Sequence, residues 1–91
     1  DLAERIRALG YPAPGSYAQF AALTQIKEST KPPAAKEMIR QLLADHEAVT
    51  RRAREANEVC DQAGDVETGD MMVERMQVHA KTAWMLRAQL E

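Results

Sequence analysis

Apolar residues recur at helical spacing along the chain, and no stretch shows the alternation of apolar and polar residues that is typical of a strand. The opening stretch, DLAERIRALG, places Leu2, Ile6 and Leu9 at helical spacing, with charged residues between them, and ends at Gly10. It lacks the turn and cap that normally precede a helix. The pattern therefore predicts an all-α fold and a chain that begins inside a helix.

Two loops rich in proline and glycine or serine separate the helical stretches, GYPAPGS at 10–16 and STKPP at 29–33. Between them, SYAQFAAL begins with a capping box, in which Ser16 accepts a hydrogen bond from the amide of Gln19 and the Gln19 side chain reaches back. The sequence predicts a short helix over 17–23 that lies across another part of the molecule.

Two long helices are predicted in the rest of the chain. The first runs from Pro33, a residue that suits a first helical turn, to Ala63, and the second runs from about Asp65 to Leu90. Gly64 suits the left-handed conformation that ends a helix, and Asp65 can cap the next one. A connection this short makes the two helices antiparallel neighbours.

Each long helix carries an apolar seam in which spacings of three and four residues alternate, as in coiled-coil packing. Other apolar side chains lie off the second seam, at Met71, Val73, Trp84 and Met85, and two helices alone do not cover them. The sequence therefore predicts a bundle with at least one further helix. The seams comprise Ile39, Leu42, His46, Val49, Ala53, Ala56, Cys60 and Ala63 in the first helix, and Met72, Met76, His79, Ala83, Leu86 and Leu90 in the second.

Composition narrows the class of protein. The 91 residues amount to one small domain, and a net charge of −2 with 4% aromatic residues provides neither a basic field nor stacking surfaces for nucleic acid. A single cysteine, Cys60, excludes an internal disulfide framework and fits a reducing compartment. No apolar run approaches the roughly 18 residues of a membrane span. The cluster Arg51, Arg52 and Arg54 is more typical of a solvated helix surface than of a phosphate site.

Four stretches of the chain resemble successive parts of one family. They are DLAERIRALG, SYAQFAALTQIKEST, EMIRQLLADHEAVTRRAREA and AGDVETGDMMVERMQVHAKTAWMLRAQL. Together they resemble the end of the second helix, the short connecting helix, the third helix and the last helix of the Dps family, the mini-ferritins named for DNA protection in starved cells. The most specific parts are AER…LG and TAWMLRA, and the resemblance covers essentially all 91 residues.

The resemblance implies a ferritin-like four-helix bundle, of which residues 1–91 form the C-terminal part of a single domain. It implies a shell of twelve subunits that oxidises Fe(II) with hydrogen peroxide or oxygen and stores the ferric mineral in a bacterial cytoplasm. Many members also bind DNA, commonly through lysine-rich tails, and this stretch shows no such tail. The alternative is a non-catalytic helical module that assembles through its exposed seams. The complete protein would be a ferroxidase, and residues 1–91 alone would be inactive.

In the family, the iron-oxidising site lies between two subunits, with two His from one and a D-x-x-x-E pair from the second helix of the other. The Glu of that pair corresponds to Glu4, which the resemblance identifies as an iron ligand and catalytic residue. The Asp corresponds to the position just before Asp1, so Asp1 itself is one residue out of register. The remaining ligands would come from polypeptide that precedes this stretch. Carboxylate and imidazole ligands do not by themselves distinguish iron from manganese.

An acidic run extends from Glu55 to Glu74, with seven carboxylates and no Lys or Arg. The resemblance implies that Asp65, Asp70 and Glu74 line a three-fold pore through which iron enters, where repetition by symmetry would concentrate cations. The alternative is that acidic residues simply favour a helix N-terminus. That alternative explains Asp65 better than it explains Asp70 and Glu74.

Three further side chains invite a chemical interpretation. His46 and His79 fall in the two seams and could meet across the helices as metal ligands, although a buried His that bonds to a carboxylate or carbonyl is commoner. Trp84 matches a Trp that recurs in the family close to the iron site. It would serve there as an oxidisable ring or as a large anchor that fills the bundle.

Overall fold

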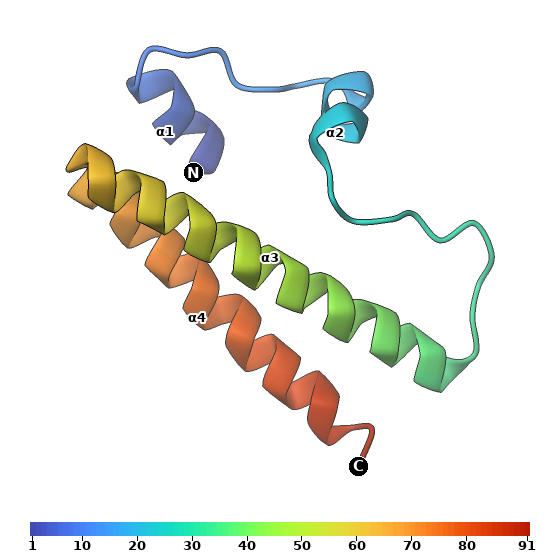
Figure 1. Ribbon diagram of the computed structural model, residues 1–91. Coiled ribbons are helices and arrows are strands. Elements are labelled where there is room, and N and C mark those ends of the chain that lie inside the picture. Colours follow the sequence, from blue (N-terminus) through green and yellow to red (C-terminus); the bar gives the residue numbers. More distant parts are fainter.

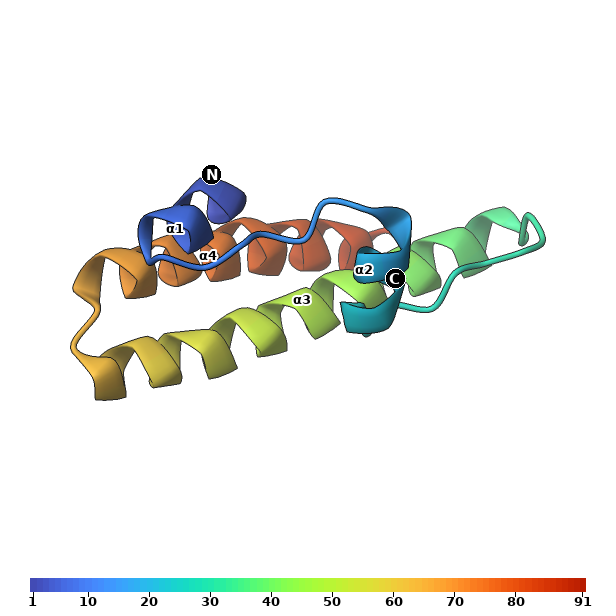
Figure 2. The same ribbon diagram turned by 90° about the horizontal axis from the view of Figure 1, so that it is seen from above.

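The computed structural model describes residues 1–91 and confirms the all-α prediction. It contains α1 (Leu2–Ala8), α2 (Tyr17–Leu23), α3 (Ala35–Ala63) and α4 (Val66–Ala88). Figure 1 shows α3 and α4 as an antiparallel hairpin, with α2 between two long connecting segments. Figure 2 shows α1 lying over the first turns of α4, near the turn that joins the two long helices. The residues that end and follow α2 approach the middle of α3 around a cavity of about 220 Å³, lined in part by Leu23, Ile26 and Val49.

The predicted start of α2 is confirmed, whereas the predicted start of α3 is two residues early. The side chain of Ser16 accepts from the amide of Gln19 at 3.2 Å, and the Gln19 side chain accepts from the amide of Ser16 at 3.1 Å. Helix α3 begins at Ala35 because Ala34 is still extended, with ψ 158°. Pro33 thus lies before the helix instead of in its first turn.

The turn between α3 and α4 follows the prediction. Gly64 ends α3 with a φ of 70°, a conformation that an L side chain disfavours. The amide of Asp65 donates to the carbonyl of Cys60 at 2.9 Å, and the Asp65 side chain caps α4 by accepting from the amide of Thr68 at 3.1 Å. This compact turn returns α4 along α3.

Small residues make up the buried part of the α3–α4 seam. Only Ala53, Cys60, Gly69 and Ala83 are buried in this chain. A Cβ placed on Gly69 would lie 3.0 Å from the side-chain oxygen of Asn57, so the two helices approach closely there. The seam is therefore built on close backbone approach and not on large side chains.

Large apolar side chains lie on the outside of the same two helices. Trp84 is 63% exposed and Met85 is 46% exposed, as expected for residues off the seam. Leu42, which the sequence places in the seam, is still half-exposed. Two helices cannot surround their own contact, so much apolar surface of the hairpin stays uncovered. None of the helices has an apolar stretch long enough to cross a bilayer.

Candidate functional site

The predicted iron ligand Glu4 lies on α1 and points into open space. Its side chain is 86% exposed and forms no ion pair with another side chain of residues 1–91. Asp1 precedes the first helical residue and makes no side-chain capping bond. Both carboxylates are therefore free to bind a ligand, whereas the guanidinium of the neighbouring Arg5 is held elsewhere.

A cavity of about 440 Å³ lies between the start of α1 and the first half of α4. Asp1 and Leu2 line it from α1, and Met71, Glu74 and Arg75 line it from α4. The structure thus brings Asp1, a candidate metal ligand, and Glu74, a candidate pore residue, to the same cavity. Glu4 lies outside the lining of this cavity.

Arg5 connects α1 to the first turn of α4. Its Nε donates to the hydroxyl of Thr68 at 2.7 Å, and the hydroxyl donates in turn to Asp65 at 2.5 Å. The guanidinium also contacts Asp65 at 3.1 Å and the exposed carboxylate of Glu67 at 3.7 Å. We call Arg5, Asp65 and Thr68 the turn network. It holds the helix that carries Glu4 against the start of α4.

The turn network determines the protonation of Asp65. The hydrogen bond from the Thr68 hydroxyl, then that from the Thr68 amide, lower the pKa of the Asp65 carboxyl below its ordinary value of 3.8, and Arg5 adds to this effect. Asp65 thus acts as a helix cap, as the alternative interpretation of the acidic run expects. The capping role of Asp65 leaves the prediction that it also lines a pore untested.

The other two candidate pore residues are exposed, and only Asp70 shares a cavity with Asp65. Asp70 lines a shallow cavity of about 220 Å³ beside the turn, together with Asp61 and Asp65. Glu74 lines the separate cavity beside α1. Asp70 and Glu74 are four residues apart on α4 and share one helix face. The pore assignment therefore stays a prediction about an assembly, with Asp70 and Glu74 as its free carboxylates.

His46 and His79 meet across the seam. Their Nδ1 atoms lie 2.9 Å apart, and their ring centroids lie 5.1 Å apart. The partner of each ring is thus the other ring, and not the carboxylate or carbonyl that is commoner for a buried histidine. Burial first, then the charges of His46 and Arg75, lower the pKa of His79 below its ordinary value of 6.5.

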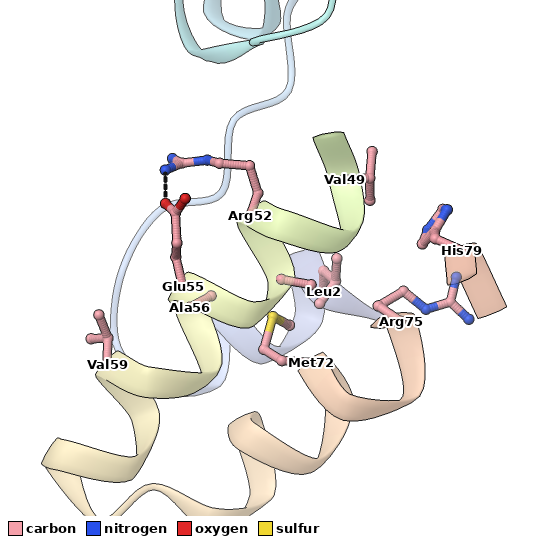
Figure 3. A pocket seen from close by; sticks show the side chains of 10 residues that line it. Leu2, Val49, Arg52, Glu55, Ala56, Val59, Met72, Arg75 and His79 are labelled. Carbon is pink, nitrogen blue, oxygen red and sulfur yellow. Dashed lines mark hydrogen bonds and ion pairs between the residues drawn. The ribbon is translucent and has the colours of Figure 1, made fainter. Parts of the chain in front are cut away.

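A groove of about 660 Å³ opens beside the histidine pair. Figure 3 shows His79 and Arg75 on one side and the α3 side chains Val49 and Arg52 on the other, with Leu2 of α1 between them. Arg52 is engaged by Glu55 at 2.8 Å, so the arginine cluster of α3 is in part neutralised on its own helix.

Trp84 and Glu4 lie far apart within one chain. Arg5 docks at Thr68, whereas Trp84 is more than four helical turns farther along α4, roughly 24 Å at 1.5 Å per residue. A role for Trp84 beside the iron site stays a prediction.

Sequence reasoning missed the turn network. Arg5 and Thr68 are separated by 63 positions, and no local pattern connects them. Two features of the sequence could have indicated this contact: the positive charge of Arg5, next to the expected ligand Glu4, and the acidic residues at the start of the last helix. No three His, Cys, Asp or Glu side chains of this chain lie close enough together to hold a metal ion.

Known proteins resemble this chain over its whole length. Residues 1–91 match the family model of the ferritin-like domain. An uncharacterized low temperature-induced protein of Nostoc is 38% identical over 99% of this chain and 51% of its own length. The DNA protection during starvation protein of Helicobacter pylori is 30% identical over 99% of this chain and 63% of its own length. The chain thus spans about half to three-fifths of these relatives.

Solved structures show the same arrangement of helices. The Dps of Staphylococcus aureus superposes with a TM-score of 0.95 at 29% identity, over 99% of this chain and 60% of the other. A Dps protein of Bacillus brevis gives a TM-score of 0.95 at 32% identity, again over 99% and 60%. The short α1, the outlying α2 and the α3–α4 hairpin therefore correspond to parts of a ferritin-like fold. The chain belongs to the Dps family of ferritin-like proteins.

Proposed function

We propose that the complete protein is a mini-ferritin that oxidises Fe(II) with hydrogen peroxide or oxygen and stores the ferric product. Iron is its substrate and cargo, and consuming iron and peroxide together protects DNA from oxidative damage. The observation that carries the proposal is the exposed carboxylate of Glu4 on a helix of a Dps-family chain. The family resemblance implies that this position is an iron ligand. Such a protein works in the bacterial cytoplasm, near the nucleoid.

Glu4 binds Fe(II) in this proposal, because a hard carboxylate oxygen suits the ion and leaves positions open for the oxidant. The second carboxylate comes from the residue before Asp1, or from Asp1 itself, and two imidazoles come from a partner subunit. The open surroundings of Glu4 support this arrangement, since a ligand that is shared between subunits must face outward.

The exposed apolar side chains of the hairpin support the proposal that further helices and other subunits cover them in the complete protein. Val59 is 66% exposed and Trp84 is 63% exposed on the outside of the hairpin. Side chains of this size are normally covered in a stable assembly. We propose that residues 1–91 form the C-terminal part of one ferritin-like domain and that twelve such domains form the shell.

Asp70 and Glu74 line the iron entry route in this proposal. Their carboxylates are exposed and share a helix face, and a symmetric assembly would repeat them around an axis and concentrate Fe(II). Asp65 stands at the same end of α4 but is already engaged as a cap, so its contribution to iron entry is the smallest of the three.

A non-catalytic assembly module is the second candidate function. The same exposed apolar surface favours it, because that surface can drive association without any iron chemistry. The two candidates differ in whether the complete protein oxidises Fe(II).

Iron oxidation by variants of the complete protein tests the proposal. Fe(II) and hydrogen peroxide are mixed anaerobically with protein, and ferric absorbance is followed with time. We expect Glu4→Gln to slow the initial rate roughly tenfold or more, because a direct ligand is lost. The matched control is Glu58→Gln, which removes the same charge from an exposed site on α3.

A protein of residues 1–91 alone should assemble poorly and oxidise little iron. If the complete protein neither oxidises nor retains iron, the assembly module is the better description. If Glu4→Gln oxidises iron as fast as Glu58→Gln, Glu4 is not a ligand even in an active ferroxidase.

A further inference from the structure

Two polar contacts join side chains of α3 to side chains of α4. One is the ion pair between Glu47 and Arg87, at 3.6 Å and partly exposed. The other is the contact between His46 and His79, at 2.9 Å between the Nδ1 atoms. Only the histidine pair, formed by His46 and His79, joins two imidazoles, the side chain that serves as a pH switch in many proteins.

The histidine pair requires a specific number of protons. A neutral imidazole has one N–H donor and one acceptor nitrogen, so a bond between two Nδ1 atoms needs one ring protonated there and the other bare. The pair meets this condition when both rings are neutral and also when one ring is cationic. When both rings are cationic, two N–H groups and two positive charges face each other at a distance that suits a hydrogen bond.

The groups that surround the pair do not offset this repulsion. Arg75 of α4 is a further positive charge near His79, and Arg52 and Glu55 of α3 line the same groove. The carboxylate of Glu55 is engaged by Arg52, and the carboxylate of Glu47 is engaged by Arg87. Neither imidazole forms an ion pair with a carboxylate of this chain.

The remaining neighbours within residues 1–91 add no counter-charge. Helix α1 contributes the apolar Leu2 to the groove beside His79, and α2 contributes no residue to it. Asp45 precedes His46 in the chain but lines a different cavity, together with Lys27 and Glu28. A doubly protonated pair therefore lies in a partly buried seam with a net excess of positive charge.

We propose that the histidine pair is an acid-sensitive latch, which holds α3 against α4 while at most one of its rings is cationic and weakens that contact when both are. The latch is independent of iron binding, since neither histidine belongs to the proposed iron site. It places a pH response in the middle of the helical hairpin.

The direction of the pH dependence follows from linkage. Burial and the neighbouring charges lower the pKa of His79 in the folded protein below its ordinary value of 6.5. The unfolded chain then binds more protons than the folded protein as the pH falls below 6.5. The contribution of the pair to stability is complete above that pH and is lost as the pH falls through the folded pKa.

Thermal unfolding of the complete protein at pH values from 7.5 to 5.0 tests the latch. We expect the wild-type Tm to fall by roughly 5 °C more than that of His46→Asn. The amide of Asn offers both a donor and an acceptor, so it can bond His79 whether that ring is neutral or cationic. Glu47→Gln is the matched control, because it removes the other contact between the helices without removing a histidine, and its pH slope should equal that of wild type.

A second measurement reads the protonation of His79 directly. The exchange rate of the imidazole C2–H of His79, measured against pH by mass spectrometry of its peptide, gives the folded pKa. We expect a midpoint below 6.5, which moves upward in His46→Asn. A midpoint at or above 6.5 in wild type, or equal pH slopes of Tm in wild type and a folded His46→Asn, would overturn the proposal.

Discussion

Two contacts of α4 differ in what holds them together. Along the seam, α4 meets α3 through small buried residues such as Ala83, which is 4% exposed, and through Gly69. At the turn, α4 meets α1 through the turn network, whose members exchange hydrogen bonds of 2.5–3.1 Å and remain partly exposed. The first contact depends on shape and the second on charge and hydrogen-bond direction.

The difference explains how one helix can serve two purposes. A seam of small residues tolerates no added volume, and acid or salt acts on it through its two polar contacts, the histidine pair and the ion pair between Glu47 and Arg87. The turn network depends on the ionised carboxylate of Asp65. Helix α1, which carries Glu4, is thus attached to α4 by hydrogen bonds and charge. The α3–α4 hairpin that supports it is closed by the close packing of small residues.

Ala83→Leu is expected to have the largest effect on stability. The added carbons have no space between the two helices, so the free energy of unfolding should fall by about 1–3 kcal/mol. Chemical denaturation measures the change, and Ala88→Leu, an exposed site at the end of the same helix, is the control with an expected change within about 0.5 kcal/mol. Equal losses at the two sites would show that shape does not govern the seam.

Asp65→Ala is expected to have an intermediate effect. It removes both the cap of α4 and the partner of Arg5, and it should lower the Tm at neutral pH by roughly 5 °C. Asp65→Asn keeps an oxygen that can cap the helix but loses the charge, so its Tm should lie between those of Asp65→Ala and wild type. A Tm of Asp65→Asn equal to that of Asp65→Ala would mean that the cap contributes nothing.

The pH dependence of the Tm of wild type and of Asp65→Asn tests the turn network. The folded pKa of Asp65 lies below 3.8, so its ionised form stabilises the fold above that pH and the stabilisation is lost as the pH falls through the folded pKa. The Tm difference between wild type and Asp65→Asn should therefore persist at neutral pH and vanish in stronger acid. A difference that is independent of pH would assign the effect to shape and not to charge.

Replacing Asp70 by Asn and Glu74 by Gln together should have the smallest effect on stability. Both side chains are exposed and neither forms an ion pair in the chain, so the Tm should change by no more than about 2 °C. Iron uptake by the assembled protein should nevertheless slow roughly tenfold, because the local cation concentration falls.

A double replacement of Glu55 and Glu58 by Gln removes the same charge from α3 and serves as the control. Uptake that is slowed equally by both double variants would reflect net charge alone. If replacing Asp70 and Glu74 leaves iron uptake unchanged, these residues do not line an iron entry route, and their only role is to favour the start of a helix.

Most of the fold was predictable because it rests on local chemistry. Ser16 and Gln19 specify the start of α2, and Gly64 and Asp65 specify the turn, since each acts within a few residues of itself. The start of α3 was predicted two residues early, because a proline fits both just before and just inside a helix. The candidate site was less predictable, since Glu4 was identified by family resemblance and its exposure was visible only in three dimensions.

The amino-acid sequence by itself determined where the helices lie, which faces are apolar and that the two long helices are antiparallel. These properties follow from spacing, capping and the length of the connection. Only the tertiary structure decided that Arg5 is engaged with Asp65 and Thr68, that Asp70 and Glu74 stay free, and that the two histidines bond each other. Such contacts join residues tens of positions apart, and their geometry depends on how closely the helices approach and how the side chains turn.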